Sequence, residues 1–342
     1  EKRTPTEKVV AREKPRGRML RKPSSTLPNL SRAAATRKKA QTVTRTIMDD
    51  IRLGKAIDVQ AAEASVSDCV ENIMSDPAAM LWMARMRTHS ERVTEHAMNV
   101  TILSIMLARH LEFDAEDLHK IGLCAMLHDV GKMRVSPEIL LEGRRTPEQE
   151  KEYQRHASYG HQILLSHKDL YPGAAEVAFR HHENIDGSGY PMGFSGEKIL
   201  PFAKIIAVGN SYDTFTVDGV DGKALSSLNA MKMLTRYAGS RYERSYVKAF
   251  VECIGLYPSG SVVLLANGCV AIVLSQDLVH RRLPNLLVVR NDKKEVCKQK
   301  VVDLGRLHKS GTSEDWLVRD VLPNGSFGVR LEDFISKGLK LD

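Results

Sequence analysis

Residues 121–132 read IGLCAMLHDVGK and decide how the centre of the chain folds. Ile121, Ala125 and His128 follow one another at spacings of four and three, which places all three on the buried face of a helix. A glycine soon breaks the pattern. Imidazole and carboxylate side chains are ligands that divalent transition metals take in proteins. The stretch therefore predicts a helix in which His128 and Asp129 form a metal-binding pair.

Other histidines occupy similar positions in the helices predicted on either side. His96 lies in an apolar stripe with spacings of three and four, and residues 146–149 form a capping box that opens a helix carrying His156. The pair His181 and His182 closes a further helix. Adjacent ligands can each reach a different ion, and two neighbouring ions are a common device for hydroxide attack on phosphorus. The pattern predicts metal-dependent phosphodiester hydrolysis.

Two features beside these ligands have both a functional and a plain structural interpretation. The loop DGSGYP at residues 186–191 either presents Tyr190 to a substrate or is an ordinary turn. Lys132, one turn after His128, either offers positive charge to a phosphate or complements a helix dipole. A single buried histidine is likewise usually a packing residue. Burying the whole set without a partner would be costly, which favours a metal site.

The bulk properties are typical of a globular protein without a membrane span. The chain has 342 residues, of which 42% are hydrophobic and 27% charged, so two domains or one domain with appendages are expected. No apolar run reaches the length of a membrane span, and no signal peptide is visible. The five cysteines are scattered and form no C-x-x-C motif. They indicate reduced thiols in the cytoplasm rather than disulfides or a zinc finger.

Positive charge is concentrated at the beginning of the chain. The net charge is +8, and residues 1–45 hold 14 Lys and Arg against three Glu. One interpretation is contact with nucleic acid, anionic lipid or an acidic partner. The segment contains several prolines and no interleaved aromatic residues, so residues 1–41 are better explained as a flexible linker or the remnant of an upstream domain.

The expected fold class is mainly α, with a helical domain over residues 42–255 and a small β-rich domain over 256–342. Helical periodicity begins near residue 42, and no strand-like alternation precedes about 255. Two β-rich runs then flank the Asn-Gly pair at residues 267–268, which is a strong hairpin signal. A second strand pair is expected over residues 286–290 and 296–302.

Three of these motifs together resemble the HD-GYP family, a subgroup of the HD metal phosphohydrolases. They are HDVGK at residues 128–132, HHE at 181–183 and DGSGYP at 186–191. The similarity covers about residues 90–218. It implies an HD-type helical bundle in a bacterial protein that hydrolyses the second messenger cyclic di-GMP to pGpG and onward to GMP, with a hydroxide held between two metal ions as the attacking group.

The resemblance also implies roles for individual residues. Two Fe(II) or Mn(II) ions would be held by seven side chains: His96, His128, Asp129, His156, His181, His182 and Asn210. Asp129 would bridge both ions, and Lys132 would steady the scissile phosphate, which makes these two the catalytic residues. Substrate contacts are expected from Lys132, Asp186, Tyr190 and Lys223.

Three departures from the family pattern bear on activity. The last expected metal carboxylate is Asn210, whose amide carries no charge, and Asp213 one turn away is a geometrically poorer substitute. Gly219 stands where an arginine is expected to hold substrate phosphate, with only Lys223 nearby. These two changes predict reduced activity. Arg92 stands where some members carry a glutamate for a third metal, so two metals are expected.

A catalytically degenerate HD-GYP module is the competing interpretation. Such a module would bind the nucleotide, or a diguanylate cyclase of the GGDEF type, and would signal through contact. The residues Asn210 and Gly219 favour it. The complete histidine set and the Tyr190 loop oppose it, because a scaffold has no physical need for six buried metal ligands. Hydrolysis of another cyclic dinucleotide and formation of a homodimer are further expectations left open.

Overall fold

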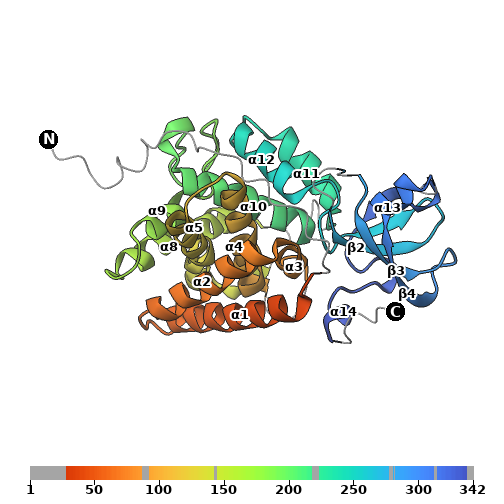
Figure 1. The fold of residues 1–342 in the computed structure, drawn as a ribbon. Coiled ribbons are helices and arrows are strands. Elements are labelled where there is room, and N and C mark those ends of the chain that lie inside the picture. Colours follow the sequence, from red (N-terminus) through yellow and green to blue (C-terminus); the bar gives the residue numbers. More distant parts are fainter. Residues whose placement is uncertain are drawn as a thin grey trace.

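A computed structural model of the chain has a helical body with a small sheet at one end (Figure 1). The described residues are 28–86, 92–141, 145–217, 223–276, 280, 282–311 and 314–336. The mainly helical fold with a β-rich C-terminal region, expected from the sequence, is confirmed. Most of the basic segment, residues 1–27, lies outside the described residues.

The first helix begins earlier than the sequence predicts. Periodicity indicates a helix from near residue 42, but α1 spans Leu30–Arg52 with Asn29 as its N-cap. Arg37 is 4% exposed and donates to the carbonyl oxygen of Met86. A charged residue therefore stands in the buried stripe of α1 and conceals the periodicity, because its aliphatic stem packs while its guanidinium reaches a backbone acceptor. Residues 30–41 belong to the helical body.

Helices α2 (Val59–Ser75) and α3 (Pro77–Met83) each begin directly after a capping aspartate. The side chain of Asp58 accepts from the amide of Ala61, and that of Asp76 accepts from the amide of Ala79. Both helices pack with α1 along one side of the bundle (Figure 1).

Five helices form the centre of the bundle and carry the predicted ligands: α4 (Arg92–His110), α5 (Ala115–Leu127), α8 (His156–Leu165), α9 (Gly173–Arg180) and α10 (Pro201–Val217). Helix α4 packs against α5 and α10, and α9 packs against α5 and α8. Every residue of α4 from Ala97 to Ala108 is buried, which makes it the central helix.

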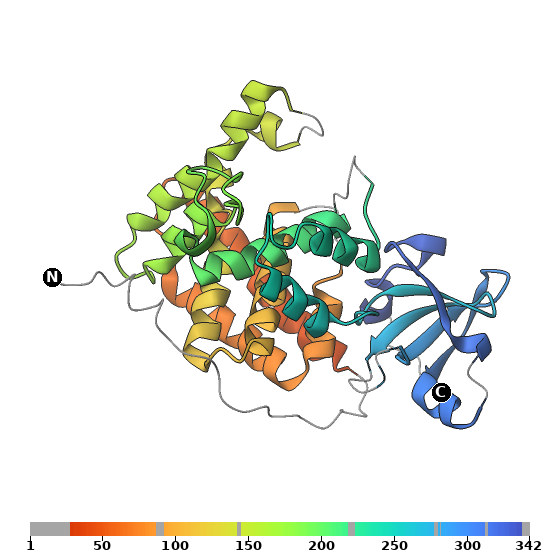
Figure 2. The same ribbon diagram turned by 90° about the horizontal axis from the view of Figure 1, so that it is seen from above.

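Two short helices, α6 (Pro137–Leu141) and α7 (Pro147–Gln154), project from this centre as the yellow-green arm in Figure 2. The capping box predicted at Thr146 is present, because its hydroxyl accepts from the amide of Gln149 and the Gln149 side chain accepts from the amide of Thr146.

The helix that carries His156 requires a correction. The sequence predicts a continuous helix from the capping box through His156, but Arg155 separates α7 from α8. The 3-10 turn η2 (Val130–Arg134) packs on the first residues of α8. A Cβ on Gly131 would lie 1.9 Å from the carbonyl oxygen of His156, so only glycine permits this approach. The break thus lets α8 start against the segment that follows α5.

Helices α11 (Ser227–Arg236) and α12 (Arg244–Ile254) lead to a fully antiparallel sheet with the order β4-β3-β2-β1-β5. Its strands are β1 (Val262–Leu265), β2 (Val270–Ser275), β3 (Asn285–Arg290), β4 (Val296–Asp303) and β5 (Val318–Leu322). The predicted hairpin joins β1 to β2. The remaining short elements are η3 (Gly196–Lys198), α13 (Leu304–Lys309), η4 (Glu314–Trp316), η5 (Ser326–Gly328) and α14 (Asp333–Ser336).

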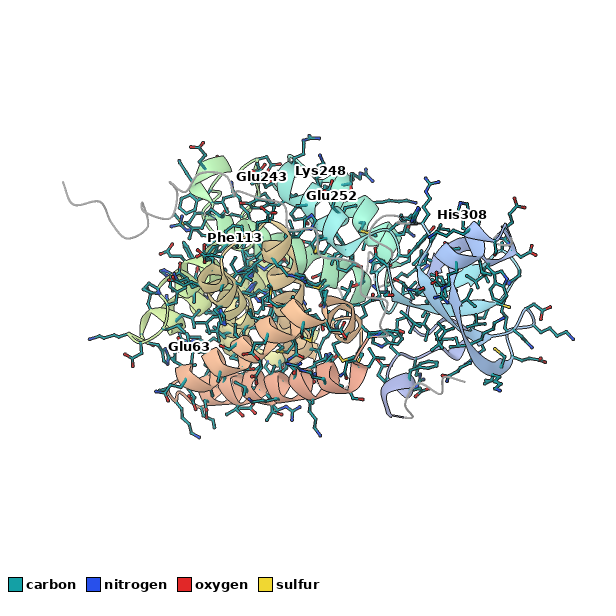
Figure 3. All side chains as sticks on the ribbon, in the orientation of Figure 1. Glu63, Phe113, Glu243, Lys248, Glu252 and His308 are labelled. Carbon is teal, nitrogen blue, oxygen red and sulfur yellow. The ribbon has the colours of Figure 1, made fainter. Side chains whose placement is uncertain are left out.

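Both faces of the sheet are buried at strands β1, β2 and β3. Alternate side chains such as Val262, Ile272 and Leu287 join the core of the helical bundle, whereas Val263 and Val273 lie in a second cluster on the other face. The β-rich region therefore shares a core with the helices. Polar side chains such as Lys248 on α12 and His308 on α13 stand on the outside (Figure 3).

Within the described ranges, no helix combines the length and the apolar character that crossing a bilayer would require.

Candidate metal centre

The ends of helices bring the predicted ligands together. His128 caps the C-terminus of α5 and is followed by Asp129, while His181 caps the C-terminus of α9. His156 is the first residue of α8. The ligand atoms form two groups, within each of which they lie within 4.8 Å of one another: His96, His128 and Asp129 in one, and Asp129, His156, His181 and His182 in the other.

Asp129 is common to both groups, and its two oxygens face different histidines. Its Oδ2 lies 3.5 Å from Nε2 of His96 and 3.3 Å from Nε2 of His128. Its Oδ1 lies 3.5 Å from Nε2 of His156 and 3.6 Å from Nε2 of His181. The carboxylate is 1% exposed. One buried side chain thus divides the cluster into two halves, which we call the Oδ2 half and the Oδ1 half.

The histidine rings are oriented by backbone carbonyls. Nδ1 of His128 lies 2.7 Å from the carbonyl oxygen of Ala125, Nδ1 of His156 lies 2.6 Å from that of Tyr153, and His181 makes the same contact with Ala178 at 2.9 Å. A carbonyl oxygen can only accept, so each Nδ1 carries the hydrogen and each Nε2 keeps a lone pair. The lone pairs are directed toward Asp129.

The surroundings keep these imidazoles neutral. Burial lowers the pKa of His128 to about 4 and the pKa of His156 to about 3, although the Asp129 carboxylate opposes both shifts. Burial, together with neighbouring His181 and His156, holds the pKa of His182 well below its ordinary value. Neutral imidazole is the form that binds a metal. Near pH 7 the cluster is therefore ready to act as a set of nitrogen ligands.

His96 is held differently, by a carboxylate from another helix. Its Nδ1 lies 2.7 Å from Oδ2 of Asp213 on α10, and Nδ2 of Asn99 donates to Oδ1 of the same carboxylate at 3.0 Å. Asp213 is thus engaged as the hydrogen-bond partner of His96, in agreement with its description as the poorer substitute for a ligand at position 210. Carboxylates behind metal-binding histidines commonly fix the tautomer and raise the basicity of the ligand. Asn210, one turn earlier on α10, is 7% exposed.

A lysine lies against Asp129, and a tyrosine lies beside that lysine. Nζ of Lys132 is 2.5 Å from Oδ2 of Asp129 and 5.6 Å from the centre of the Tyr153 ring. Burial alone would lower the pKa of Lys132, but the Asp129 carboxylate and Tyr153 outweigh it and raise that pKa. Burial alone would raise the pKa of Asp129, but His128 and Lys132 hold it well below its ordinary value. The ion pair is therefore fully charged at neutral pH.

The loop after the histidine pair folds back onto it. The ring of Tyr190 stacks on that of His182 with centroids 4.6 Å apart, and the amide of Tyr190 donates to the carbonyl of His182. A Cβ on Gly189 would lie 2.4 Å from the carbonyl oxygen of His182, so this contact requires glycine. Glu183, 3% exposed, accepts hydrogen bonds from the amides of Met192 and Phe194. Its carboxylate holds the far end of the loop.

A cavity of about 400 Å³ opens next to these residues. Four residues of the predicted site line its walls: His181, His182, Tyr190 and Asn210. The walls also include Glu150 of α7 and Ser211, Arg241 and Tyr242. Three of the four predicted substrate contacts, Lys132, Asp186 and Lys223, are not among the lining residues. Asp186 is exposed, and its carboxylate accepts from the amide and the hydroxyl of Ser188 within its own loop. Lys223 is exposed and lies elsewhere.

The donor atoms fit divalent metal ions. Among the described residues, five ligand atoms of the cluster are buried without a hydrogen-bond partner: Nε2 of His128, His156, His181 and His182, and Oδ1 of Asp129. Leaving buried polar atoms without a partner is costly, so their convergence on one point requires a ligand. Imidazole nitrogen with carboxylate oxygen is the donor set that Zn, Fe and Mn ions take.

Comparison with known proteins agrees with this site. The family model described as the HD domain matches residues 81–246. The fold and the ligand cluster thus define an HD-domain protein. Within that class, the chain belongs to the HD-GYP family. Among solved structures, Bd1817, an HD-GYP-type protein from Bdellovibrio bacteriovorus, shares the fold with a TM-score of 0.55 and 20% identity over 72% of this chain and 75% of that one.

Curated relatives carry phosphodiesterase names. The chain is 33% identical to cyclic di-GMP phosphodiesterase PA4108 of Pseudomonas aeruginosa, over 80% of this chain and 66% of the relative. It is 31% identical to a cyclic di-GMP phosphodiesterase of Thermotoga maritima, over 49% of this chain and 45% of the relative. It is 28% identical to 3'3'-cGAMP-specific phosphodiesterase 3 of Vibrio cholerae, over 48% of this chain and 35% of the relative. In each case the chain spans less than two thirds of the relative's length.

Several residues at the site escaped the sequence analysis. Glu183 lies within a quoted motif, but its role as loop anchor depends on amides nine and eleven residues later. Asn99 stands one turn after His96, and that spacing on a buried face is the signal that could have identified it. Tyr153, three residues before His156, offers the same kind of spacing signal. Arg241 offers none, since its neighbours in the cavity wall come from other elements.

Proposed function

We propose that this chain is a metal-dependent phosphodiesterase that hydrolyses cyclic di-GMP to pGpG, with GMP as a further product. The observation that carries the proposal is Asp129, whose two oxygens face two separate sets of histidine nitrogens. This is the arrangement that a pair of metal ions sharing one carboxylate requires. The names of the curated relatives support the nucleotide substrate.

The proposed ligands follow the two halves of the cluster. In the Oδ2 half, one ion would be held by His96, His128 and Asp129, with Asn210 as a neutral fourth ligand. In the Oδ1 half, the second ion would be held by Asp129, His156, His181 and His182. Fe(II) or Mn(II) is proposed for both positions, because imidazole and carboxylate donors suit these ions. Arg92, at the position where a third ion would need a carboxylate, limits the site to two ions.

The chain's own residues prepare the reaction. When bound, the ions supply a water of lowered pKa and offset charge on the phosphoryl oxygens. Lys132 retains its proton and holds an ammonium group beside Asp129, where it stabilises the negative charge that develops on the scissile phosphate. Burial raises the pKa of Tyr190, so its phenol stays protonated and can donate a hydrogen bond to substrate in the cavity.

The degenerate module remains the second candidate, because Asn210 in place of a carboxylate weakens one half of the site. It would bind cyclic di-GMP, or a GGDEF diguanylate cyclase, without hydrolysing the nucleotide. A homodimer is proposed for the hydrolase and for the degenerate module alike. The cytoplasm is the proposed location, since all five cysteines are free thiols. The five partnerless donor atoms weigh against the degenerate module, because a protein that never binds metal gains nothing from them.

The deciding experiment is turnover of cyclic di-GMP by anaerobically purified protein loaded with Fe(II) or Mn(II). A variant combining His128→Ala and Asp129→Ala serves as the control, and metal content is measured on both proteins. We expect pGpG or GMP from the parent protein and none from the control. Metal-replete parent protein that yields no product would overturn the hydrolase and favour the nucleotide-binding module.

A further inference from the structure

The cavity contains an arginine that the family pattern does not anticipate. The arginine expected to hold substrate phosphate corresponds to Gly219, which lies outside the described residues. Lys223, the nearby alternative, is exposed and does not line the cavity. Arg241, between α11 and α12, does line it, together with the metal-site residues His182 and Asn210. Within the described residues, the cavity wall thus takes its arginine from the segment between α11 and α12.

The backbone around Arg241 is held in place by two segments. The Arg241 amide donates to the carbonyl of Tyr237 at 3.0 Å, which closes a tight turn. The Arg241 carbonyl accepts from the amide of Ile185 at 3.2 Å, and the neighbouring Ser240 carbonyl accepts from Asp186 at 2.9 Å. These bonds tie Arg241 to the loop that carries Tyr190. Any ligand that contacts one therefore lies beside the other.

The guanidinium of Arg241 is available to an anion. Its Cζ lies 4.4 Å from the centre of the Tyr237 ring. It also donates a hydrogen bond to the Tyr242 hydroxyl, and its charge lowers the pKa of the Asp186 carboxyl from a distance. A guanidinium has five N–H donors, so donors remain for an anion. Among the described residues, no carboxylate forms an ion pair with it. The two acids that line the cavity are engaged elsewhere: Glu150 lies 3.5 Å from Arg145, and Glu183 accepts two backbone amides.

Arg241 is also the one lining residue, within the described part of the chain, that carries a full positive charge. We propose that it binds the phosphate of cyclic di-GMP that is not being cleaved. The inference rests on the proposed function, because a cyclic dinucleotide has two phosphates and only one can lie at the metal ions. A planar guanidinium can hold the second by two parallel hydrogen bonds. The phosphate-binding role has thus moved from the position of Gly219 to Arg241.

The test is equilibrium binding of a non-hydrolysable phosphorothioate analogue of cyclic di-GMP to Mn(II)-loaded full-length protein. Arg241→Ala should weaken binding by about 10- to 100-fold, because a charge-assisted pair is lost, and should raise KM for cyclic di-GMP more than it lowers kcat. Metal content of the variant checks that the centre is assembled. Arg236→Ala, an exposed arginine of α11 that does not line the cavity, is the matched control and should bind as the parent does.

The outcomes separate this inference from the function on which it rests. Arg241→Lys should recover part of the affinity for the analogue, since lysine keeps a positive charge for a phosphate. If Arg241→Lys instead binds the analogue as weakly as Arg241→Ala does, Arg241 contacts a guanine edge, and the phosphate role is overturned. An alanine variant that binds normally overturns the inference and leaves the phosphodiesterase standing. Parent protein that cleaves bis(p-nitrophenyl) phosphate but neither binds nor cleaves cyclic di-GMP overturns the proposed substrate, and the inference with it.

Discussion

The two halves of the metal centre differ in how their ligands are supported. In the Oδ1 half, His156 and His181 are each held by a backbone carbonyl three residues earlier in the chain. In the Oδ2 half, His96 depends on Asp213, which lies 117 residues away in the sequence. His128 of the Oδ2 half is held in the same local way, by the carbonyl of Ala125. Only His96 takes its orientation from a side chain on another helix, so the Oδ2 half is complete only once α4 and α10 have packed together.

The halves also differ in the type of their ligands. The Oδ1 half has three histidines and shares the carboxylate, while the Oδ2 half has two histidines and shares the same carboxylate. The fourth ligand that we propose for the Oδ2 half is the neutral amide of Asn210, which is a weaker donor for a transition-metal ion than imidazole is. We therefore expect the Oδ2 position to bind its ion more weakly and to limit activity at low metal concentration.

The largest effect is expected where the halves meet. Asp129→Asn keeps the shape of the side chain but removes the shared negative charge, and it leaves Lys132 buried beside a neutral amide. Both ions should be lost and turnover should fall to the background level. Metal analysis and turnover of cyclic di-GMP check this, with thermal unfolding as the test that the fold survives. Retention of one full equivalent of metal would contradict the bridging role.

A smaller and one-sided effect is expected from Asp213→Asn. His96 would lose its carboxylate partner, and loss of such a partner typically lowers metal affinity by about 10- to 100-fold. Stepwise metal titration should show weaker binding of one ion and unchanged binding of the other.

Asn99→Ala provides a graded control for the same network. Asn99 only supports Asp213, through one hydrogen bond to Oδ1, so its loss should weaken the same ion to a lesser degree. Equal weakening of both ions by Asp213→Asn would show that the halves are not independent.

The opposite change is expected from Asn210→Asp. A carboxylate at this position adds a negative charge to the Oδ2 half, and one charge-assisted contact of this kind contributes about 1.5 kcal/mol, or about tenfold in affinity. The variant should reach full turnover at lower metal concentration than the parent protein. An unchanged metal dependence would mean that residue 210 does not contact the ion.

The smallest effect is expected from Tyr190→Leu, which removes the ring stacked on His182. Such ring pairs contribute about 0.5–1.5 kcal/mol, so the ion in the Oδ1 half should bind only a few-fold more weakly. Tyr190→Phe keeps the stack and should leave metal binding unchanged, which separates the ring from its hydroxyl. Equal losses in both variants would assign the effect to the hydroxyl.

Several features of the fold were predictable because their signals are local. The caps at Asp58, Asp76 and Thr146 and the Asn-Gly hairpin each act over a few residues, and all four are present. The start of α1 was missed because Arg37 interrupts its apolar stripe. The break at Arg155 was missed because it serves a contact with Gly131 that no helical period encodes.

The sequence by itself determined the mainly helical fold and the residue types that converge on the centre, because burial of histidines follows helical periodicity. Only the tertiary structure decided which oxygen of Asp129 faces which histidine, that Asp213 supports His96, and that Arg241 enters the cavity while Lys223 does not. These contacts join residues far apart in the chain. The packing of whole helices sets such distances, and the spacing of residues along any one helix does not contain them.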